Sequence, residues 1–426
     1  MAATDTSRPV RAARAAALLV IVALVLLGTA QAATAALPPI SARSYIVVQP
    51  DTGDVVASRN PSGERPIAST TKMMTALLSI EHARPSDVFR VASYNLSPGE
   101  STAGLRAGEK MRVGDLLRAL MLPSANEAAV TLAIGVAGSQ ARFVKMMNQR
   151  ARQLGLRHTH FGNPIGLDVG ANHSSARDLA KLAQVLRANA FLRATMNMRR
   201  ATLHSGPVGR VVVNRNSLVQ EIGWVDGVKT GHTTLAGFVL VASGTRNGVP
   251  VISAVLGEPD EGLRNSDSLA LLRYAAARYH EVLVTRKGRR MARVPLAYRD
   301  TTVALVASRT TRRVIRRGEK TTITLVGVPK KLDGPLPRGS RQGTIVVRYR
   351  GRVVDRVALL TAEPVAAATV IEKVDDTVPG GVAALGIVLG LLGVGTLLLL
   401  GDRRRRRRRE ARRSRPRPSR QETGVA

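Results

Sequence analysis

Ser69 and Lys72 stand three residues apart in RPIASTTKMMTALLSI, residues 65–80, whose apolar residues predict a buried helix that begins near Ser69. Side chains at positions i and i+3 of a helix are neighbours. A serine hydroxyl becomes a nucleophile when a base is within hydrogen-bonding reach, and a lysine can be that base when burial or a second cation lowers its pKa. A lysine in the first helical turn otherwise opposes the helix dipole. A capping serine beside a solvated lysine is the structural alternative.

Lys229, in the segment DGVKTGHTT, supplies a second cation. At the start of a strand, Lys229 and Thr230 point to opposite faces, and Gly231 lets a ligand lie close to the backbone. An edge-strand lysine that blocks aggregation is the alternative. It explains Lys229 alone, and leaves the following Thr-Gly and the Ser69–Lys72 pair unexplained.

A serine two residues before an asparagine occurs three times, in Ser58-Arg-Asn60, Ser93-Tyr-Asn95 and Ser124-Ala-Asn126. The first ends a predicted hairpin, and the second lies in a turn-rich stretch. The third opens the helix NEAAVTLAIG after the apolar run LLRALML, so we favour Ser124 and Asn126 as members of the same cleft. Ser124 and Glu127 also match a helix capping box, which is the structural alternative here.

The two ends of the chain carry export and membrane signals. Residues 1–36 combine three arginines, an apolar run and small-residue cleavage sites, as a signal peptide does, although an uncleaved anchor stays open. Residues 380–400 carry no charge and are long enough for a transmembrane helix, and seven arginines, Arg403 to Arg409, follow. Because positive residues stay cytoplasmic, we expect a single-pass protein of the cell membrane, with an extracytoplasmic catalytic domain and a basic tail at 401–426.

The net charge of +34 is not confined to these ends. Residues 402–426 contribute +9 and residues 1–14 contribute +2, so the exported body keeps about +23, which favours anionic wall polymers as neighbours. No basic stretch is rich in aromatic residues, so we do not expect nucleic acid as a partner. The arginine run is explained by topology and by contact with anionic lipid. With no cysteine, the exported part must fold on a hydrophobic core without disulfides.

The elements that position these residues fall in residues 37–282. A predicted hairpin comes first, helices follow at 70–83, 113–122, 126–138, 140–154 and 175–188, and strands around 210–257 precede a last helix. This order predicts an α/β (α+β) domain in which helices flank an antiparallel sheet and the N-terminal hairpin returns beside the later strands. Residues 283–363 then read as a small all-β domain, and residues 364–379 as a linker to the membrane.

The combination and order of S-x-x-K, S-x-N and K-T-G are typical of penicillin-binding proteins and class A β-lactamases. The wider text of residues 40–282, including RPIASTTKMMTALL, LLRALMLPSANEAAVTLA and VDGVKTGHTTLAGFVLVASG, resembles the low-molecular-weight D-alanyl-D-alanine carboxypeptidases of peptidase family S11. The resemblance implies the penicillin-binding, β-lactamase-like transpeptidase fold. It also implies a serine hydrolase of the cell wall that needs no cofactor and no metal.

The resemblance implies a role for each site residue. Ser69 is expected to be the acylated nucleophile, Lys72 its general base and Ser124 a proton relay to the leaving amine. The Asn126 amide is expected to hold the substrate's peptide bond. Lys229 and Thr230 are expected to bind the terminal carboxylate of the substrate, with Gly231 beside them. The backbone N–H groups of His232 and Ser69 are expected to form an oxyanion hole. Arg215 and Arg264 are expected to steer the carboxylate into the site.

Two features depart from the family pattern. The second motif reads Ser-Ala-Asn-Glu where Ser-Gly-Asn-Asp is more usual, and the anchor is a full transmembrane helix rather than an amphipathic one. Both polar side chains of the motif are kept, so we expect the activity to be kept. The change of anchor alters attachment and not chemistry.

Three other functions share part of these sequence features. A β-lactamase would use the same serine and lysine, but FGNPIGLD stands where a class A enzyme carries a glutamate for deacylation. A metallopeptidase would need clustered ligands, and the H-x-H pair His158 and His160 can bind zinc, but no third ligand with convincing spacing follows. A non-catalytic wall-associated scaffold would not need the complete motif set. We therefore expect hydrolysis of peptidoglycan stem peptides and acylation by β-lactam inhibitors.

Overall fold

The computed structural model describes residues 36–168, 171–377 and 381–413. The predicted signal peptide lies almost wholly outside these residues. The chain divides into two compact units: one ends at Val282 and also takes in Val314–Glu319, and the other comprises Leu283–Arg313 and the residues from Lys320 onward.

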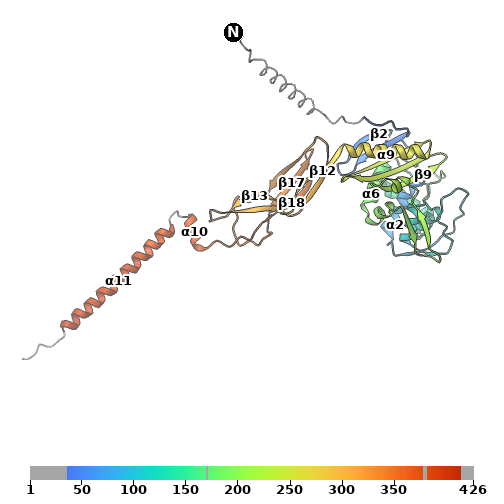
Figure 1. Ribbon diagram of the computed structural model, residues 1–426. Coiled ribbons are helices and arrows are strands. Elements are labelled where there is room, and N and C mark those ends of the chain that lie inside the picture. The colour runs from blue at the N-terminus through green and yellow to red at the C-terminus, as the bar shows by residue number, and fades with distance from the viewer. Residues whose placement is uncertain (1–35, 169–170, 378–380, 414–426) are drawn as a thin grey trace, which may run out of the picture. The chain divides into compact units, whose positions relative to one another are not determined.

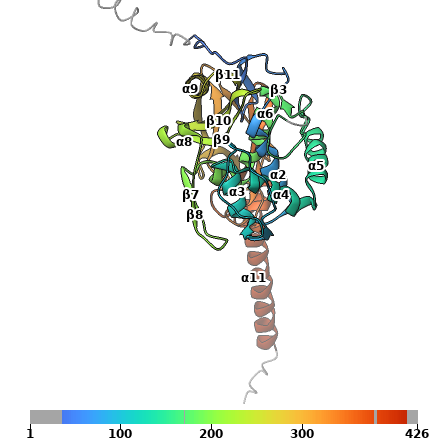
Figure 2. The ribbon, with the colours of Figure 1, turned by 90° about the vertical axis from the view of Figure 1, so that its right-hand side faces the viewer.

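The first unit is built on a five-stranded antiparallel sheet in the order β2-β1-β11-β10-β9 (Figures 1 and 2). The N-terminal hairpin returns beside the later strands, as predicted, because Ile46 pairs with Ala254 across β1 and β11. The hairpin between β10 and β11 turns at Asn247 and Gly248, both with positive φ. The strands are β1 (Ser44–Gln49), β2 (Asp54–Arg59), β9 (Val225–Thr233), β10 (Gly237–Arg246) and β11 (Val249–Glu258).

Both faces of this sheet are covered. Ile46 and Ile252 point into the core shared with helices α2, α3, α4 and α6, whereas Val47 and Val255 point into a second core against α9. Alternate residues of each central strand therefore enter different cores, so β1 is buried along its whole length. The helices are α2 (Lys72–His82), α3 (Val113–Met121), α4 (Asn126–Ala137), α5 (Gln140–Gln153), α6 (Ala176–Ala188), α7 (Ala190–Met196), α8 (Ser217–Glu221) and α9 (Glu261–Ala277).

The predicted helices agree with this list within a few residues, with two exceptions. The helix expected to begin near Ser69 starts as a 3₁₀ turn, η1 (Ala68–Thr71), and becomes α-helical at Lys72. The short helices α7 and α8 were not predicted. Three two-stranded ribbons complete the unit: β3 (Arg65–Pro66) with β6 (His173–Ser174), β4 (Val88–Arg90) with β5 (Lys110–Arg112), and β7 (Arg200–Leu203) with β8 (Arg210–Val213).

The second unit contains an antiparallel sheet in the order β13-β14-β18-β17-β16. Its inner face carries Leu305, Ile345, Val347 and Val357, all fully buried, which provides a small core without disulfides. Its strands are β13 (Arg290–Pro295), β14 (Thr302–Ala307), β16 (Thr321–Val326), β17 (Arg341–Tyr349) and β18 (Arg352–Thr361), and a separate pair is formed by β12 (Tyr279–Thr285) and β15 (Thr311–Arg316).

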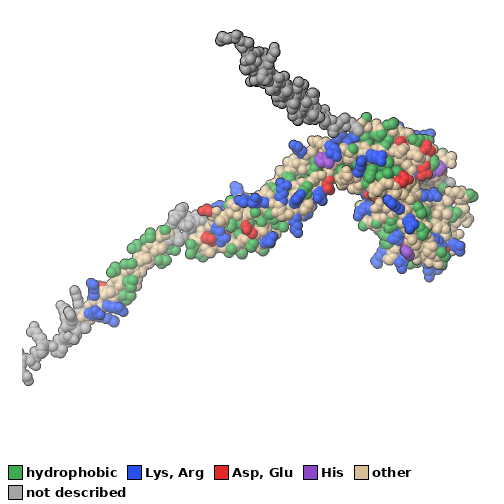
Figure 3. All heavy atoms as spheres, viewed as in Figure 1, with side chains coloured by type: hydrophobic (Ala, Val, Ile, Leu, Met, Phe, Trp, Pro, Cys, Tyr) green, Lys and Arg blue, Asp and Glu red, His purple; other side chains and the backbone are tan. Residues whose placement is uncertain are grey.

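Two helices follow the β domain. The segment expected to be a plain linker contains α10 (Val370–Thr377), and α11 (Gly381–Arg413) follows it. Residues Ala383–Arg408 of α11 are long and apolar enough to cross a membrane. Apolar side chains cover most of this helix, and arginines gather toward its end (Figure 3).

Candidate active site

Ser69 and Lys72 meet as their spacing predicts. Ser69 lies in η1, and Lys72 is the first residue of α2 and is fully buried. The Lys72 ammonium donates to Ser69 Oγ at 2.9 Å and to the Ile165 carbonyl at 2.7 Å. A buried lysine is therefore held on the serine hydroxyl by a carbonyl 93 residues away in sequence, and the alternative of a solvated lysine is wrong.

Backbone constraints shape the turn that carries Ser69. Ala68 has a φ of +46°, a region that residues with a side chain rarely adopt. Two glycines press on this turn: a Cβ on Gly166 would lie 2.0 Å from the Ala68 carbonyl oxygen, and one on Gly231 would lie 3.1 Å from the Ser69 nitrogen. A Cβ on Gly166 would force this turn to move, and one on Gly231 would crowd the Ser69 backbone. Gly231 therefore serves close packing as well as the expected approach of a ligand.

Burial lowers the pKa of Lys72 into the range in which an amine can act as a base. Desolvation lowers its pKa from 10.5 to about 7; the negative charge of Glu100 opposes this shift, Arg215 adds to it and Glu127 opposes it. A lysine with a pKa near 7 is partly neutral at physiological pH, and its free amine can accept the serine proton.

Lys229 lies on β9 and is 1% exposed, so the interpretation of an aggregation-blocking edge lysine is wrong. Its ammonium donates to the carbonyl of Thr230 at 3.0 Å. Burial lowers its pKa well below the ordinary value, and the charges of Lys72, Arg215 and Arg264 lower it further. Because the charge of Lys72 acts on Lys229 and Arg215 acts on both, the two lysines lie within one site.

Ser124 and Asn126 flank the N-cap of α4, and the capping interpretation of Ser124 is wrong. The N-cap of α4 is Ala125, and Ser124 precedes it in a left-handed conformation with φ +69°. The Ser124 hydroxyl is buried and has no hydrogen-bond partner among the described residues. A buried hydroxyl without a partner is costly in a folded protein and is typical of a functional position.

The segment that contains the rejected Ser93-Tyr-Asn95 motif supplies residues that the sequence did not reveal. Glu100 accepts hydrogen bonds from the Asn126 side-chain amide at 2.6 Å and from the Tyr94 hydroxyl at 2.5 Å. Burial raises the pKa of Glu100, but these hydrogen bonds outweigh burial and hold that pKa below its usual range. Because its NH₂ group is engaged by Glu100, Asn126 keeps its carbonyl oxygen available as an acceptor.

Glu127, the residue that departs from the usual second motif, has a structural task. Its carboxylate accepts from the Thr102 hydroxyl at 2.7 Å and from the N–H groups of Ala103 and Leu105 at 2.7 and 3.3 Å. These bonds fasten the loop that carries Glu100 onto the start of α4. Glu127 therefore supports the position of Asn126 through Glu100.

The remaining predicted residues also gather here. Arg215 donates to the Ser101 hydroxyl at 2.8 Å, and its charge acts on both lysines. His232 is exposed and stacks on Phe238 with ring centroids 4.0 Å apart, and Arg264 lies over the same ring at 5.9 Å. Arg264 is 3% exposed, and burial lowers its pKa.

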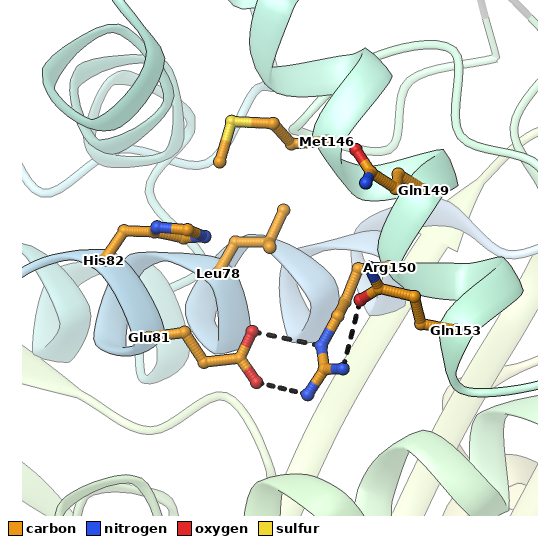
Figure 4. Close-up of a pocket in the computed structure, with 7 residues that line it drawn as sticks. All are labelled: Leu78, Glu81, His82, Met146, Gln149, Arg150 and Gln153. Atoms are coloured by element: carbon orange, nitrogen blue, oxygen red, sulfur yellow. Dashed lines mark hydrogen bonds and ion pairs between the residues drawn. The ribbon is translucent and has the colours of Figure 1, made fainter.

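Two other features lie apart from this constellation. His158 pairs with Glu64 at 3.5 Å and His160 stacks on His173, and no cluster suited to a metal ion occurs within the described residues. A pocket of about 360 Å³ lies between α2 and α5, where Arg150 pairs with Glu81 beside Leu78 (Figure 4). None of its lining residues belongs to the Ser69 site.

Taken as chemistry, the site joins a hydroxyl nucleophile to a buried amine base, with cations placed to attract an anionic ligand. The basic side chains of Lys72, Lys229, Arg215 and Arg264 outnumber the nearby carboxylates of Glu100, Glu127 and Glu261, the last of which pairs with Arg264. This arrangement fits acyl transfer on a substrate that ends in a carboxylate. Fold and site together have the arrangement of a serine hydrolase in which a buried lysine contacts the serine.

Comparison with known proteins agrees with this arrangement. The family model Peptidase_S11, described as D-alanyl-D-alanine carboxypeptidase, matches residues 30–260. The chain is 30% identical to the D-alanyl-D-alanine carboxypeptidase DacF of Bacillus subtilis, with 76% of this chain and 85% of the relative aligned. It is 31% identical to DacA of Escherichia coli strain K12, over 80% of this chain and 87% of that one. Penicillin-binding protein 5 from Haemophilus influenzae superposes with a TM-score of 0.56 at 28% identity, covering 78% of this chain and 99% of the other.

The chain belongs to the S11 family of D-alanyl-D-alanine carboxypeptidases. The predicted fold class and the predicted enzyme class are both confirmed.

Proposed function

We propose that this enzyme removes the terminal D-alanine from peptidoglycan stem peptides through an acyl-enzyme on Ser69. The observation that carries the proposal is the 2.9 Å contact between Ser69 Oγ and the buried Lys72 amine, whose pKa is lowered to about 7. Neutral Lys72 takes the hydroxyl proton while Oγ bonds to the carbonyl carbon of the penultimate residue. The N–H groups of Ser69 and His232 stabilise the resulting oxyanion.

The second half of the reaction uses the other motif residues. Ser124 passes a proton from Lys72 to the leaving amine as the C–N bond breaks, which releases D-alanine and leaves an ester on Ser69. Water then attacks this ester, Lys72 accepts its proton, and the shortened peptide leaves as Ser69 regains its hydrogen. Lys229 and Thr230 bind the terminal carboxylate, and Gly231 lies beside them. The positive charges of Arg215 and Arg264 add to the field that attracts this carboxylate. The Asn126 carbonyl accepts a hydrogen bond from a substrate N–H.

The cellular setting follows from the two ends of the chain. We propose that residues 1–36 direct export, that α11 crosses the cell membrane once, and that residues 401–426 stay in the cytoplasm. The catalytic domain then faces the cell wall, and no cofactor takes part. β-Lactams are expected to acylate Ser69, because their strained amide imitates the scissile bond.

Release of D-alanine from an N-acylated peptide ending in D-alanyl-D-alanine tests the activity. We expect steady release by the purified enzyme, and none from Ser69→Ala. Absence of release from folded wild-type protein, or equal release by the Ser69→Ala variant, would reject the proposal. Rapid hydrolysis of penicillin without peptide cleavage would favour the β-lactamase alternative.

A further inference from the structure

One end of the β domain combines exposed apolar and basic residues where the chain leaves for α11. We call the surface formed by residues 325–331 and 338–341 the exit surface, because strand β18 finishes beside it at Thr361. The Gly339 N–H donates to the Thr361 carbonyl at 3.0 Å, and the Thr361 N–H donates to Ser340 at 2.9 Å. The loop between β16 and β17 is thereby fixed to the departing chain.

The strand register places the end of β16 on the same side. Arg341 pairs with Leu360, one residue before β18 ends, and Val326 pairs with Thr344. Thr321, where β16 begins, pairs instead with Tyr349 near the opposite end of the sheet. Val326 and Arg341 therefore share the end at which the chain departs.

The exit surface has the composition of a membrane-contacting surface. Leu325 and Val326 are 37% and 51% exposed on an edge strand that leaves one side unpaired. The loop that follows this strand crosses the same end of the sheet toward β13, where Leu332 bonds to Pro295 and Ala297, and it carries exposed basic side chains. Residues 327–341 contain one acid, Asp333. These basic residues are Lys330, Lys331, Arg338 and Arg341. Apolar side chains flanked by cations suit the boundary between anionic headgroups and acyl chains.

The chain itself keeps this surface near a bilayer. Eighteen residues separate Thr361 from the apolar stretch at 380–400, and eight of them form α10. Ten extended residues and a two-turn helix reach at most about 50 Å. A surface tethered at this range meets the membrane at a high effective concentration, so even weak attraction suffices for docking.

We propose that the exit surface binds anionic phospholipid headgroups of the bilayer that α11 crosses, with Leu325 and Val326 at the interface. The inference rests on the proposed membrane insertion of α11. Docking would hold the β domain against the membrane instead of leaving it free on its linker. The attraction is electrostatic, so it depends on lipid charge and weakens with salt.

The test uses the full-length enzyme in lipid nanodiscs and exploits the absence of native cysteine. Val326→Cys carries a single polarity-sensitive fluorophore, and Val353→Cys, which is 37% exposed beside the β17–β18 turn, is the matched control. We expect a blue shift for the label at 326 in phosphatidylglycerol discs relative to phosphatidylcholine discs, and loss of this shift at 1 M salt. The label at 353 should not respond to lipid charge.

A charge-matched pair of variants identifies the residues responsible. Lys330→Gln with Lys331→Gln should reduce the ratio of docked to undocked protein about thirtyfold in phosphatidylglycerol discs. Lys287→Gln with Lys320→Gln removes the same charge at the other end of the sheet and should leave the shift intact. D-alanine release should be unchanged in both, which shows that the catalytic unit is folded, and unchanged circular dichroism of both variants tests the fold of the β domain.

Three results would overturn the inference. The first is an equal emission wavelength of the label at 326 in phosphatidylglycerol and phosphatidylcholine discs. The second is an equal loss of the blue shift in the Lys330/Lys331 and the Lys287/Lys320 double variants. The third is a full blue shift in phosphatidylcholine discs when soluble polyphosphate is added, which would indicate that the surface binds a wall polymer instead. Failure of the enzyme to enter discs of either lipid would instead contradict the insertion of α11. Loss of peptidase activity would bear on the proposed function alone.

Discussion

The catalytic unit and the β domain differ in the solvent exposure of their basic side chains. In the catalytic unit Lys72, Lys229 and Arg264 are 0%, 1% and 3% exposed. In the β domain the basic side chains lie mostly at the surface (Figure 3). Lys287 and Lys320 are both exposed. Both regions carry many solvated cations at their surfaces, but the catalytic unit also buries Lys72, Lys229 and Arg264 in a low-dielectric interior.

This difference explains which charges can do chemistry. A buried ammonium loses hydration, so its pKa falls toward the range in which a lysine exchanges protons at neutral pH. A solvated ammonium keeps its charge and acts on partners through its field. We therefore expect the two regions to respond to substitution on very different scales.

The largest effect is expected at Lys72. Lys72→Ala removes the base that the serine requires and should lower kcat/KM for D-alanine release by about 10²- to 10⁴-fold. Lys181→Ala, at an exposed position on α6, is the matched control and should retain full activity. A Lys72→Ala enzyme that is folded and active would show that burial of this lysine serves another purpose.

An intermediate effect is expected at Glu100. Lys72 acts in its neutral form, so activity should rise with pH through about 7. The charge of Glu100 raises the pKa of Lys72, so Glu100→Gln should move this midpoint to lower pH, by on the order of one unit. Glu81→Gln, in the pocket of Figure 4, should not move it. If Glu100→Gln left the midpoint of the pH–activity profile unchanged, Glu100 would not influence Lys72 and would serve only to orient Asn126.

A buried acid of the catalytic unit provides a test of stability. Burial, followed by the charge of Asp267, raises the pKa of Glu258 to about 8 from an ordinary value of 4.5. The folded state then holds this proton more tightly than the unfolded state. Stability attributable to Glu258 is therefore complete below pH 4.5 and is lost as pH rises toward 8.

Thermal unfolding between pH 5 and 8 measures this dependence. Glu258→Gln cannot lose a proton, so its melting temperature should fall less steeply with pH than that of the wild type. Glu221→Gln, at an exposed position, should reproduce the wild-type slope. Parallel slopes for wild type and Glu258→Gln would contradict the linkage.

The smallest effect is expected in the β domain. Lys320→Gln removes a solvated charge and should change the free energy of unfolding by less than about 0.5 kcal/mol, with D-alanine release unaltered. Denaturant titration measures the difference. A loss above 2 kcal/mol would mean that the β domain depends on its surface cations, and the contrast between the regions would fail.

Sequence patterns predicted contacts that the structure contains. Ser69 and Lys72 meet as their spacing indicates, Lys229 is buried within the field of Lys72, and local apolar periodicity placed α2 to α6. The catalytic roles of these residues, and the choice of Ser124 over the other two candidates, stay predictions. The spacing and the periodicity are local, since each is set by neighbours within one or two helical turns. The family resemblance supplied the roles.

What the sequence could not reveal depends on contacts between distant segments. The Ile165 carbonyl that holds Lys72 and the Gly166 that presses on Ala68 come from a loop about a hundred residues later. Glu100 lies in a turn-rich stretch without periodicity, and only the fold brings it to Asn126. Short elements such as α7 and α10 were missed because a few residues carry too little periodic signal.

The central claim is that Ser69, activated by Lys72, is the acylated residue. Intact-protein mass spectrometry of residues 37–379 after exposure to penicillin, followed by peptide mapping, tests it most directly. The account predicts one persistent adduct, mapped to Ser69 and absent from Ser69→Ala. An adduct on another residue, or no adduct on folded protein, would contradict it.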